Sequence, residues 1–262
     1  MPRRYRHVVR RFLLSPRWLA FHLLVLVGVV AMVNLGLWQL RRLDERRSFN
    51  AVIEAAYDSA PVPLDRLIDP TWRVDPAGLA AVEESGATWR PVVVTGTYEP
   101  EATLRVVNRS QYGRAGDNLV VPLRLDDGRL VLVNRGFVPL GVDDPPLPSL
   151  VVEVLGRIRT TEQRGTVGAR DPAEGILTEV QRLDLERLAS QFGEGLLPVT
   201  IDLMSSIPAE ADGLPQPVIR PDLSEGSHLS YAVQWFIFSG AAVVGWALAI
   251  RISIRRRSSA ET

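Results

Sequence analysis

One histidine stands where a long apolar segment begins, and its neighbours could take part in coordination chemistry. The stretch "SHLSYAVQWF" places His228 ahead of Tyr231 and Trp235. On a helix these residues, at i, i+3 and i+7, share one face. A haem iron needs an axial nitrogen, flat or apolar walls, and cations for its propionates. The spacing therefore makes His228 a candidate ligand of a haem iron, with Tyr231 and Trp235 as walls.

The other parts of such a site come after a second apolar segment. Trp38 and Gln39 stand at its outer end, and Arg41 and Arg42 follow directly. Two helices that cross the same bilayer bring these residues to the depth of His228. The alternative is an ordinary interfacial belt, because Trp and Tyr are enriched at membrane surfaces and His is tolerated there. Spacing alone favours the belt.

The two remaining histidines do not complete the site. His22 lies four residues into the first apolar segment, so a length of helix of about 25 Å separates it from the level of His228. Two axial ligands of one iron must flank the same metal atom, which excludes this pair within one chain. His7 belongs to a basic amino-terminal tail and is predicted to be solvated.

Two segments are predicted to be transmembrane helices. Residues 18–40 and 229–250 carry no charge, and each would form a helix of about 33 Å, against a hydrocarbon core of about 30 Å. The tails, residues 1–17 and 251–262, hold ten Arg, whereas the inner flanks hold five. This surplus favours a two-pass protein of a bacterial plasma membrane with both termini cytoplasmic. Residues 41–228 are then extracytoplasmic.

The predicted extracytoplasmic domain is acidic and lacks the usual catalytic residues. It holds 20 Arg against 29 acidic residues, which argues against nucleic-acid binding. The chain has no Cys, and residues 41–227 have no His, so thiolate metal sites and the commonest bases are excluded there. Metalloprotease, P-loop and dinucleotide-binding motifs are also missing. We therefore predict a binding or docking module and not an enzyme.

Strand patterns dominate this domain. Residues 91–110 hold two β-rich runs around Pro100, and residues 118–140 hold a second pair around the turn Asp126-Asp127-Gly128. Further strands are expected at 150–161, 176–180 and 198–203, and helices at 40–57, continuing the first span, and 183–191. The expected fold is a membrane α+β protein. Terminal transmembrane helices flank one antiparallel β-rich domain with a few helices, curled into a barrel or sandwich.

Asn-Arg pairs end two of these runs, at Asn108-Arg109 and Asn134-Arg135. The pairs could form a matched polar site where the strands end. Alternatively, each Arg pairs with a carboxylate and each Asn shapes the following turn. The second interpretation is favoured.

Four stretches resemble the surfeit locus protein 1 family, in the order in which that family has them. They are "GLWQLRRLDER", "RPVVVTGTYEPE", "NLVVPLRLDDGRLVLVNRGFVP" and "HLSYAVQWF". Together they span nearly the whole chain, and the predicted architecture is also similar. All 30 basic residues are Arg, which suggests a high-GC bacterial genome and hence an actinobacterial-type member.

The resemblance implies a biogenesis or accessory factor of haem a-containing cytochrome c oxidase. Such a factor holds haem a, transiently or in substoichiometric amounts, while it enters the catalytic subunit. The implied partners are that subunit, a respiratory supercomplex containing it, the haem a synthesis machinery and the lipid bilayer. The histidine that opens the second span is the implied ligand, and His228 occupies that place. Gly226-Ser227 stands where the family has Asn, so Ser227 must orient the imidazole if a preceding residue does.

Four further residues match motifs of that family, with an expected structural or docking role: Gly96, Asn134, Arg135 and Gly136. Two other functions are compatible with the sequence. One is a membrane-anchored extracytoplasmic ligand sensor or scaffold that binds no haem. The other is a haem-modifying or hydrolytic membrane enzyme, against which the lack of His in the outer domain counts.

Overall fold

The computed structural model describes residues 13–148, 150–163, 168–210 and 213–260, with side chains as far as Arg256. Most of the predicted basic tail, including His7, falls outside these ranges. The chain divides into two compact units. One combines residues 1–51 with 222–262, and the other comprises residues 52–221.

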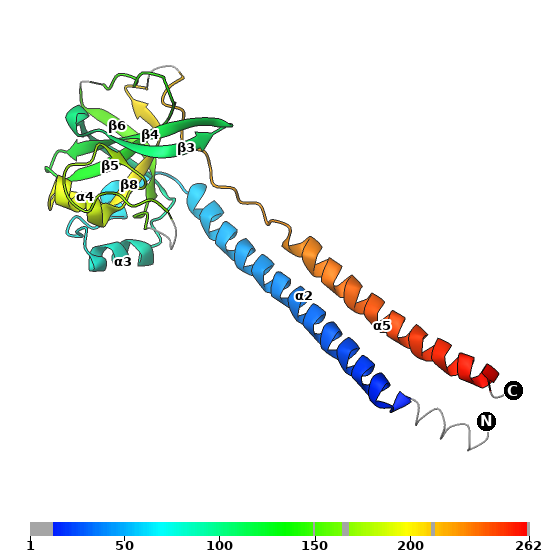
Figure 1. Cartoon of the computed structure of the whole chain (residues 1–262). Coiled ribbons are helices and arrows are strands. Elements are labelled where there is room, and N and C mark those ends of the chain that lie inside the picture. Colours follow the sequence, from blue (N-terminus) through cyan, green and yellow to red (C-terminus); the bar gives the residue numbers. More distant parts are fainter. Residues whose placement is uncertain (1–12, 149, 164–167, 211–212, 261–262) are drawn as a thin grey trace. The chain divides into compact units, whose positions relative to one another are not determined.

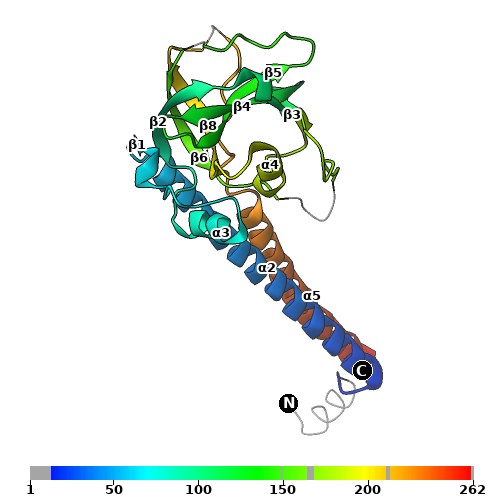
Figure 2. The same cartoon turned by 90° about the vertical axis from the view of Figure 1, so that its left-hand side faces the viewer.

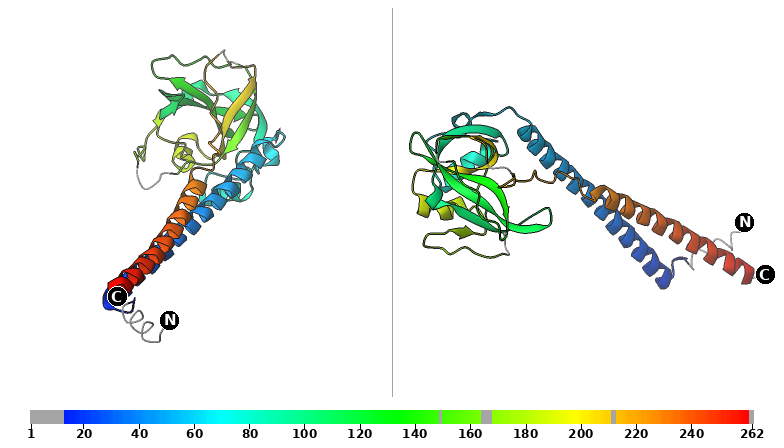
Figure 3. Two further views of the ribbon diagram at one scale, coloured as in Figure 1. Left: turned by 90° about the vertical axis from the view of Figure 1, so that its right-hand side faces the viewer. Right: turned by 90° about the horizontal axis from the view of Figure 1, so that it is seen from above.

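The first unit is a pair of long helices. Helix α2 covers Pro16–Tyr57 and helix α5 covers His228–Ala260, and the two run side by side (Figure 1 and Figure 3). Both are long and apolar enough to cross a membrane. The continuation of the first helix to residue 57 confirms the sequence-based prediction.

Small residues form the contact between the two helices. Gly36 of α2 is buried, and a Cβ placed on it would lie 2.8 Å from the ring of Phe236. On α5, Ala232 and Ser239 are buried. Large apolar side chains face outward instead, such as Leu24 and Ile237, which are 71% and 62% exposed. This division suits helices that associate through small residues and present Leu and Ile to lipid.

The second unit is a mixed eight-stranded sheet (Figure 2). Its strands are β1 Val62–Pro63, β2 Pro91–Tyr98, β3 Leu104–Gln111, β4 Arg114–Leu125, β5 Leu130–Pro139, β6 Val152–Arg159, β7 Glu179–Val180 and β8 Leu196–Ile207. The strand order is β1-β2-β6-β8-β5-β4-β3-β7, and β2 also pairs with β4. That pairing closes β2, β6, β8, β5 and β4 into a ring, so of the two predicted forms, barrel or sandwich, the sheet adopts the barrel.

Short helices complete this unit: η1 Leu64–Arg66, α3 Pro76–Glu84, η2 Pro100–Ala102 and α4 Leu185–Phe192. The predicted helix at 183–191 corresponds to α4, whereas α3 was not predicted. Asp75 caps α3 by accepting a hydrogen bond from the Gly78 N–H, with Pro76 in the first turn.

The predicted antiparallel sheet is in fact mixed, with both antiparallel and parallel pairs. The hairpin of β4 and β5 at residues 126–128 is confirmed, but β5 runs parallel to β8, and β1–β2 and β3–β7 are also parallel. The two runs around Pro100 do not pair with each other, because η2 separates them and both β2 and β3 pair with β4. The strand predicted at 176–180 shortens to two residues, and the one predicted at 198–203 lengthens to twelve.

The ring closes at a glycine. Gly96 of β2 pairs with Leu125 of β4, and a Cβ on Gly96 would lie 2.4 Å from the carbonyl oxygen of Arg124. Any larger residue there forces the two backbones apart. Strand β5 is buried along its whole length, so both of its faces are covered, and it carries Asn134 and Arg135 into the interior.

Candidate functional site

The outer end of the helix pair brings together two of the predicted site residues. Gln39 of α2 and His228, the first residue of α5, are joined by a 2.8 Å contact between Oε1 and Nδ1. A carbonyl oxygen only accepts hydrogen bonds, so Nδ1 carries the hydrogen, and in the neutral imidazole Nε2 keeps its lone pair. An imidazole fixed in this way presents Nε2 to a metal, and metal-ligating histidines commonly bond a carbonyl group through the other nitrogen.

A clamp of polar side chains on α2 positions the segment that leads to His228. Arg46 donates to the carbonyl oxygens of Asp222 and Ser224, at 2.7 and 3.2 Å. Asn50 donates to the carbonyl of Leu223 at 2.5 Å. These bonds hold residues 222–224 along the helix and set where α5 begins.

An ion pair extends the clamp. The Arg47 guanidinium binds both carboxylate oxygens of Glu225, at 2.7 and 2.8 Å. The hydrogen bond from Arg47 holds the pKa of the Glu225 carboxyl below its usual range. Arg47 thereby bonds the segment only three residues before His228.

The other four predicted cofactor-binding residues are not gathered around His228 by direct contacts. Trp38 and Tyr231 are about half exposed, at 47% and 49%. Trp235 packs edge-on against Phe238, with ring centroids 6.1 Å apart. Arg41 is exposed and makes no ion pair within the described residues. Among these residues, Ser227 makes no side-chain bond to the imidazole either. Gln39 takes the orienting role that was expected of Ser227.

The opposite end of the helix pair holds the second histidine. The indole Nε1 of Trp246 donates to Nδ1 of His22 at 2.8 Å, and the rings meet edge to face with centroids 5.7 Å apart. An indole N–H only donates, so Nδ1 of His22 is the acceptor and Nε2 carries the hydrogen. His22 therefore offers no Nε2 lone pair while this bond holds. Among the described residues, no group of three or more His, Cys, Asp or Glu could hold a metal ion.

In the barrel, the predicted docking residues are largely buried. Arg135 is 2% exposed. It forms an ion pair with Glu210, with Nε to Oε1 at 2.9 Å, and donates to the carbonyls of Pro145 and Pro146. Gly136 has φ +128°, and a Cβ there would lie 2.1 Å from the carbonyl oxygen of Gln216. Both residues tie β5 to the segments beside it.

The two Asn-Arg pairs differ from the expectation in one respect. Arg109 and Arg135 do pair with carboxylates, those of Glu162 and Glu210. Asn134, however, shapes no turn, because it lies inside β5 and donates from Nδ2 to Oδ1 of Asp202 at 2.9 Å. Asn108 adopts φ +61° at an irregularity of β3, where left-handed backbone suits Asn.

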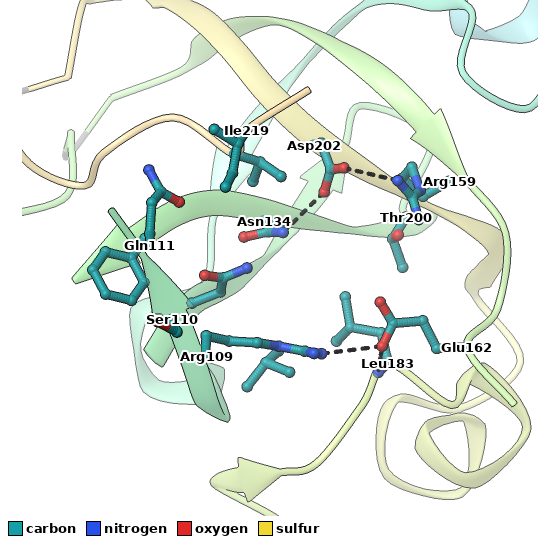
Figure 4. A pocket seen from close by; sticks show the side chains of 14 residues that line it. Arg109, Ser110, Gln111, Asn134, Arg159, Glu162, Leu183, Thr200, Asp202 and Ile219 are labelled. Carbon is teal, nitrogen blue, oxygen red and sulfur yellow. Dashed lines mark hydrogen bonds and ion pairs between the residues drawn. The ribbon is translucent and has the colours of Figure 1, made fainter. Parts of the chain in front are cut away.

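A polar cavity of about 220 Å³ lies where these groups meet (Figure 4). Arg109 and Glu162, 3.2 Å apart, form one wall. Asn134 and Asp202 form the opposite wall, and Arg159 lies 3.7 Å from Asp202. Burial raises the pKa of the Asp202 carboxyl, while Arg159 and Asn134 oppose the shift.

Sequence reasoning missed this cavity. Glu162 and Asp202 did not stand out from 29 acids in the domain, because the strands that bring them together lie far apart along the chain. One local signal of a polar site was present on β6, where Arg157 and Arg159 alternate with buried residues.

The comparisons with known proteins bear on the whole chain. The model of the SURF1 family matches residues 26–240, which include most of α2, the whole barrel and the first part of α5. The chain belongs to the SURF1 family. It is 29% identical over 253 residues to an uncharacterised SURF1-like protein of Mycobacterium tuberculosis (strain H37Rv), covering 94% of this chain and 88% of the relative.

More distant SURF1 relatives span both bacteria and animals. Surfeit locus protein 1 of Homo sapiens is 26% identical over 245 residues, covering 85% of this chain and 75% of that protein. A SURF1-like protein of Rickettsia bellii is 24% identical over 234 residues, covering 85% and 87%. The mycobacterial similarity agrees with the predicted actinobacterial type.

Proposed function

We propose that this SURF1 family member is a non-enzymatic biogenesis or accessory factor of haem a-containing cytochrome c oxidase. The observation that supports the proposal is the bond between Gln39 and His228, which leaves Nε2 of a half-buried imidazole able to ligate iron. The site lies at one end of a pair of helices that are long enough to cross a membrane. Family membership supplies the link to the oxidase.

Each side chain at this end has a role toward haem a. His228 supplies the axial nitrogen, and Gln39 holds the ring and its tautomer. The exposed rings of Trp38 and Tyr231, with Trp235, are apolar surfaces for the macrocycle. Arg41, which has no carboxylate partner among the described residues, is a cation for a propionate. When bound, haem a is cargo on its way to the catalytic subunit.

The proposed topology places this end outside the cytoplasm. Both Arg-rich tails remain inside a bacterial plasma membrane, and the barrel lies outside, where it docks on the catalytic subunit or on a respiratory supercomplex. The haem a synthesis machinery then delivers haem at the outer surface. The clamp formed by Arg46, Arg47 and Asn50 holds the helix pair in place by bonding α2 to the segment before α5.

The first experiment is an absorption spectrum of the detergent-purified protein, co-expressed with haem a synthesis. We expect a haem a band in the wild type and in His22→Ala, and its loss in His228→Ala. His22→Ala is the matched control, because it removes a histidine from the same helix pair. Equal bands in all three proteins would exclude His228 as ligand. No band in the wild type, with the oxidase still co-purifying, would mean a scaffold without haem.

A second experiment tests the link to the oxidase. Deletion of the protein is expected to lower oxidase activity selectively, with the other respiratory complexes intact. Complementation with the wild-type chain should restore the activity, and His228→Ala should restore less of it. An unchanged oxidase after deletion would favour the sensor function instead.

A further inference from the structure

Two arginines on β6 have guanidinium groups that are fixed in place but donate no hydrogen bond within the described residues. Arg157 and Arg159 lie two residues apart on the same face of the strand, about 6.6 Å apart along it. Within the described part of the chain, neither guanidinium makes a hydrogen bond, and Nε of Arg157 is buried without a partner. An Arg that keeps five donors unused in a folded protein is unusual.

Aromatic rings hold both guanidiniums. Arg159 lies over the ring of Trp89, at 3.6 Å from its centroid, and Arg157 lies over Tyr57 at 3.7 Å. The guanidinium of Arg220 also lies over the Tyr57 ring, at 4.7 Å from its centroid. A ring on one face fixes the plane of a guanidinium and leaves its N–H edges directed elsewhere. The residues are therefore preorganised to donate hydrogen bonds.

The local charge is positive. Three guanidiniums gather around Tyr57 and Trp89, and the only carboxylate paired with them among the described residues is Asp202, 3.7 Å from Arg159. That separation is too long for a hydrogen bond. Asp202 is itself already bonded by Asn134. Three guanidiniums against one carboxylate leave positive charge uncompensated here. Of the three, Arg159 lines the cavity described above, and Arg157 precedes it by two residues on β6.

Arg159 also lines the polar cavity described above. It has room for about seven molecules of water, or a small metabolite, at about 220 Å³. Asn134 lines it and is 6% exposed, and its Oδ1 has no hydrogen-bond donor within the described residues. In Figure 4 this oxygen points away from Asp202, whereas the amide nitrogen points toward it. A buried acceptor without a partner is costly, and a ligand that brings a donor would satisfy it.

We propose that the barrel binds a small polar metabolite that carries an oxyanion and a hydroxyl. Arg157 and Arg159 hold the oxyanion, a carboxylate or a phosphate, and Asn134 accepts from the hydroxyl. Planar guanidiniums match both oxyanions, because each can receive two parallel hydrogen bonds. The site lies wholly within residues 52–221 and does not depend on haem or on the oxidase.

The test is isothermal titration calorimetry of the full chain in detergent. Malate and inorganic phosphate are the probes, and they distinguish a carboxylate from a phosphate ligand. Malamide, which is uncharged, and chloride at matched ionic strength are the controls. We expect one of the two probes to bind and neither control to do so. If neither probe binds, or if chloride competes equally well, the proposal is wrong.

Variants then locate the binding. Arg157→Gln and Arg159→Gln are each expected to weaken binding of the successful probe on the order of tenfold or more, because a charged donor is lost. Arg124→Gln, which removes an exposed Arg elsewhere on the barrel, should bind as the wild type does. Equal affinity in all of these variants would reduce the finding to an adventitious ion only.

A structural role alone is excluded by two further measurements. Near-ultraviolet circular dichroism checks that each variant keeps its tertiary structure, since Gln also removes the contact with a ring. If the β6 variants do not fold, Arg220→Gln provides the test, because Arg220 is exposed and stacks on the same Tyr57. We expect a severalfold weaker affinity in this variant, and unchanged affinity would overturn the proposal.

Discussion

The two ends of the α2–α5 pair each hold a histidine, and the two imidazoles are bonded in opposite senses. At one end Nδ1 of His228 donates to Gln39, and at the other Nδ1 of His22 accepts from Trp246. The donor–acceptor distance is 2.8 Å in each bond. The partner decides the direction, because an amide oxygen accepts and an indole nitrogen donates. In the neutral ring, His228 therefore keeps a bare Nε2, whereas His22 carries hydrogen there.

The direction of the hydrogen bond distinguishes a candidate ligand from a packing residue, whatever the place of each histidine along its helix. Both histidines lie in the same helix pair, and both are partly buried. His22 is surrounded by the rings of Trp18, Phe21 and Trp246, so its environment is that of an aromatic cluster. Among the described residues, the His228 ring has one hydrogen bond, to the Gln39 amide, and a clamp fixes the segment that leads to its helix. One neighbour sets the chemistry of each imidazole.

The largest effect on both ends is expected from a substitution at the contact between the two helices, where Gly36 packs against Phe236. Gly36→Leu places a side chain where a Cβ alone is 2.8 Å from the Phe236 ring, so the helices must move apart. Overpacking of this kind costs about 1–3 kcal/mol, and both interhelical bonds should be lost with it. Because the chain has no Cys, spin labels can be attached at Leu37→Cys and Ile237→Cys, and their distance distribution should broaden.

Gly28→Leu is the matched control for that experiment. It makes the same substitution in the same helix, but nothing lies within 4 Å of a Cβ at Gly28. The distance distribution should stay as narrow as in the wild type. An equally narrow distribution in Gly36→Leu would show that the helices do not depend on this contact.

The next pair of substitutions tests the two ends separately. Gln39→Leu removes the acceptor of His228, whereas Trp246→Phe removes the donor of His22. If His228 is the ligand, Gln39→Leu should weaken haem a binding about 10- to 100-fold, as loss of such an orienting partner usually does. Trp246→Phe should leave the affinity unchanged. Absorbance titration of the two variants with haem a gives the comparison, and equal losses would remove the distinction between the ends.

Sequence patterns predicted the helix pair and one of its contacts, but not the direction of the bonds. Uncharged runs long enough to cross a bilayer gave the two helices, and equal depth gave the nearness of Gln39 and His228. The role of Ser227 could not be decided from the chain, because the residue that bonds the imidazole is 189 positions away. The outward exposure of Tyr231 depends on which stripe of α5 faces α2, and packing against Gly36 sets that.

In the barrel, local signals predicted what is local. The turn at residues 126–128 predicted the β4–β5 hairpin, and alternation predicted β6. The parallel pairing of β5 with β8 joins Asn134 to Asp202, 68 positions apart, and no neighbouring residue announces it. The cavity depends on that pairing, so its carboxylates could not be chosen from the others. Closure of the ring at Gly96 was likewise visible only once β4 lay against β2.

A smaller effect is expected in the tautomers themselves. The protein has three histidines, so selective ¹⁵N-histidine labelling gives a simple spectrum. At a pH where the rings are neutral, His228 should be the Nδ1–H tautomer and His22 the Nε2–H tautomer. A hydrogen bond worth about 0.5–1.5 kcal/mol favours each form roughly 2- to 12-fold. Gln39→Leu should return only His228 to the mixture of a free imidazole. The same tautomer at both residues would contradict the opposite bonding of the two ends.

The smallest expected effect is at the clamp, which lies at the His228 end. Glu225 is exposed, and its bond with Arg47 lowers its pKa from the ordinary value of 4.5. A carboxyl with a lowered pKa stabilises the clamped form above that ordinary value, and the stabilisation is lost as the pH falls through the lowered pKa. The Nε–H signal of Arg47 should therefore shift toward that of a solvated guanidinium, with a midpoint below pH 4.5.

Two variants show whether this transition belongs to the clamp. Glu225→Gln should abolish it, because no carboxylate remains to titrate beside Arg47. Glu45→Gln should leave it unchanged, since Glu45 pairs with Arg42 within α2 and does not bond the segment before His228. Added salt should weaken the Arg47 bond, as it does for exposed ion pairs. A midpoint at or above 4.5 in the wild type would mean that Arg47 does not hold Glu225 in solution, and that Arg46 and Asn50 alone set where α5 begins.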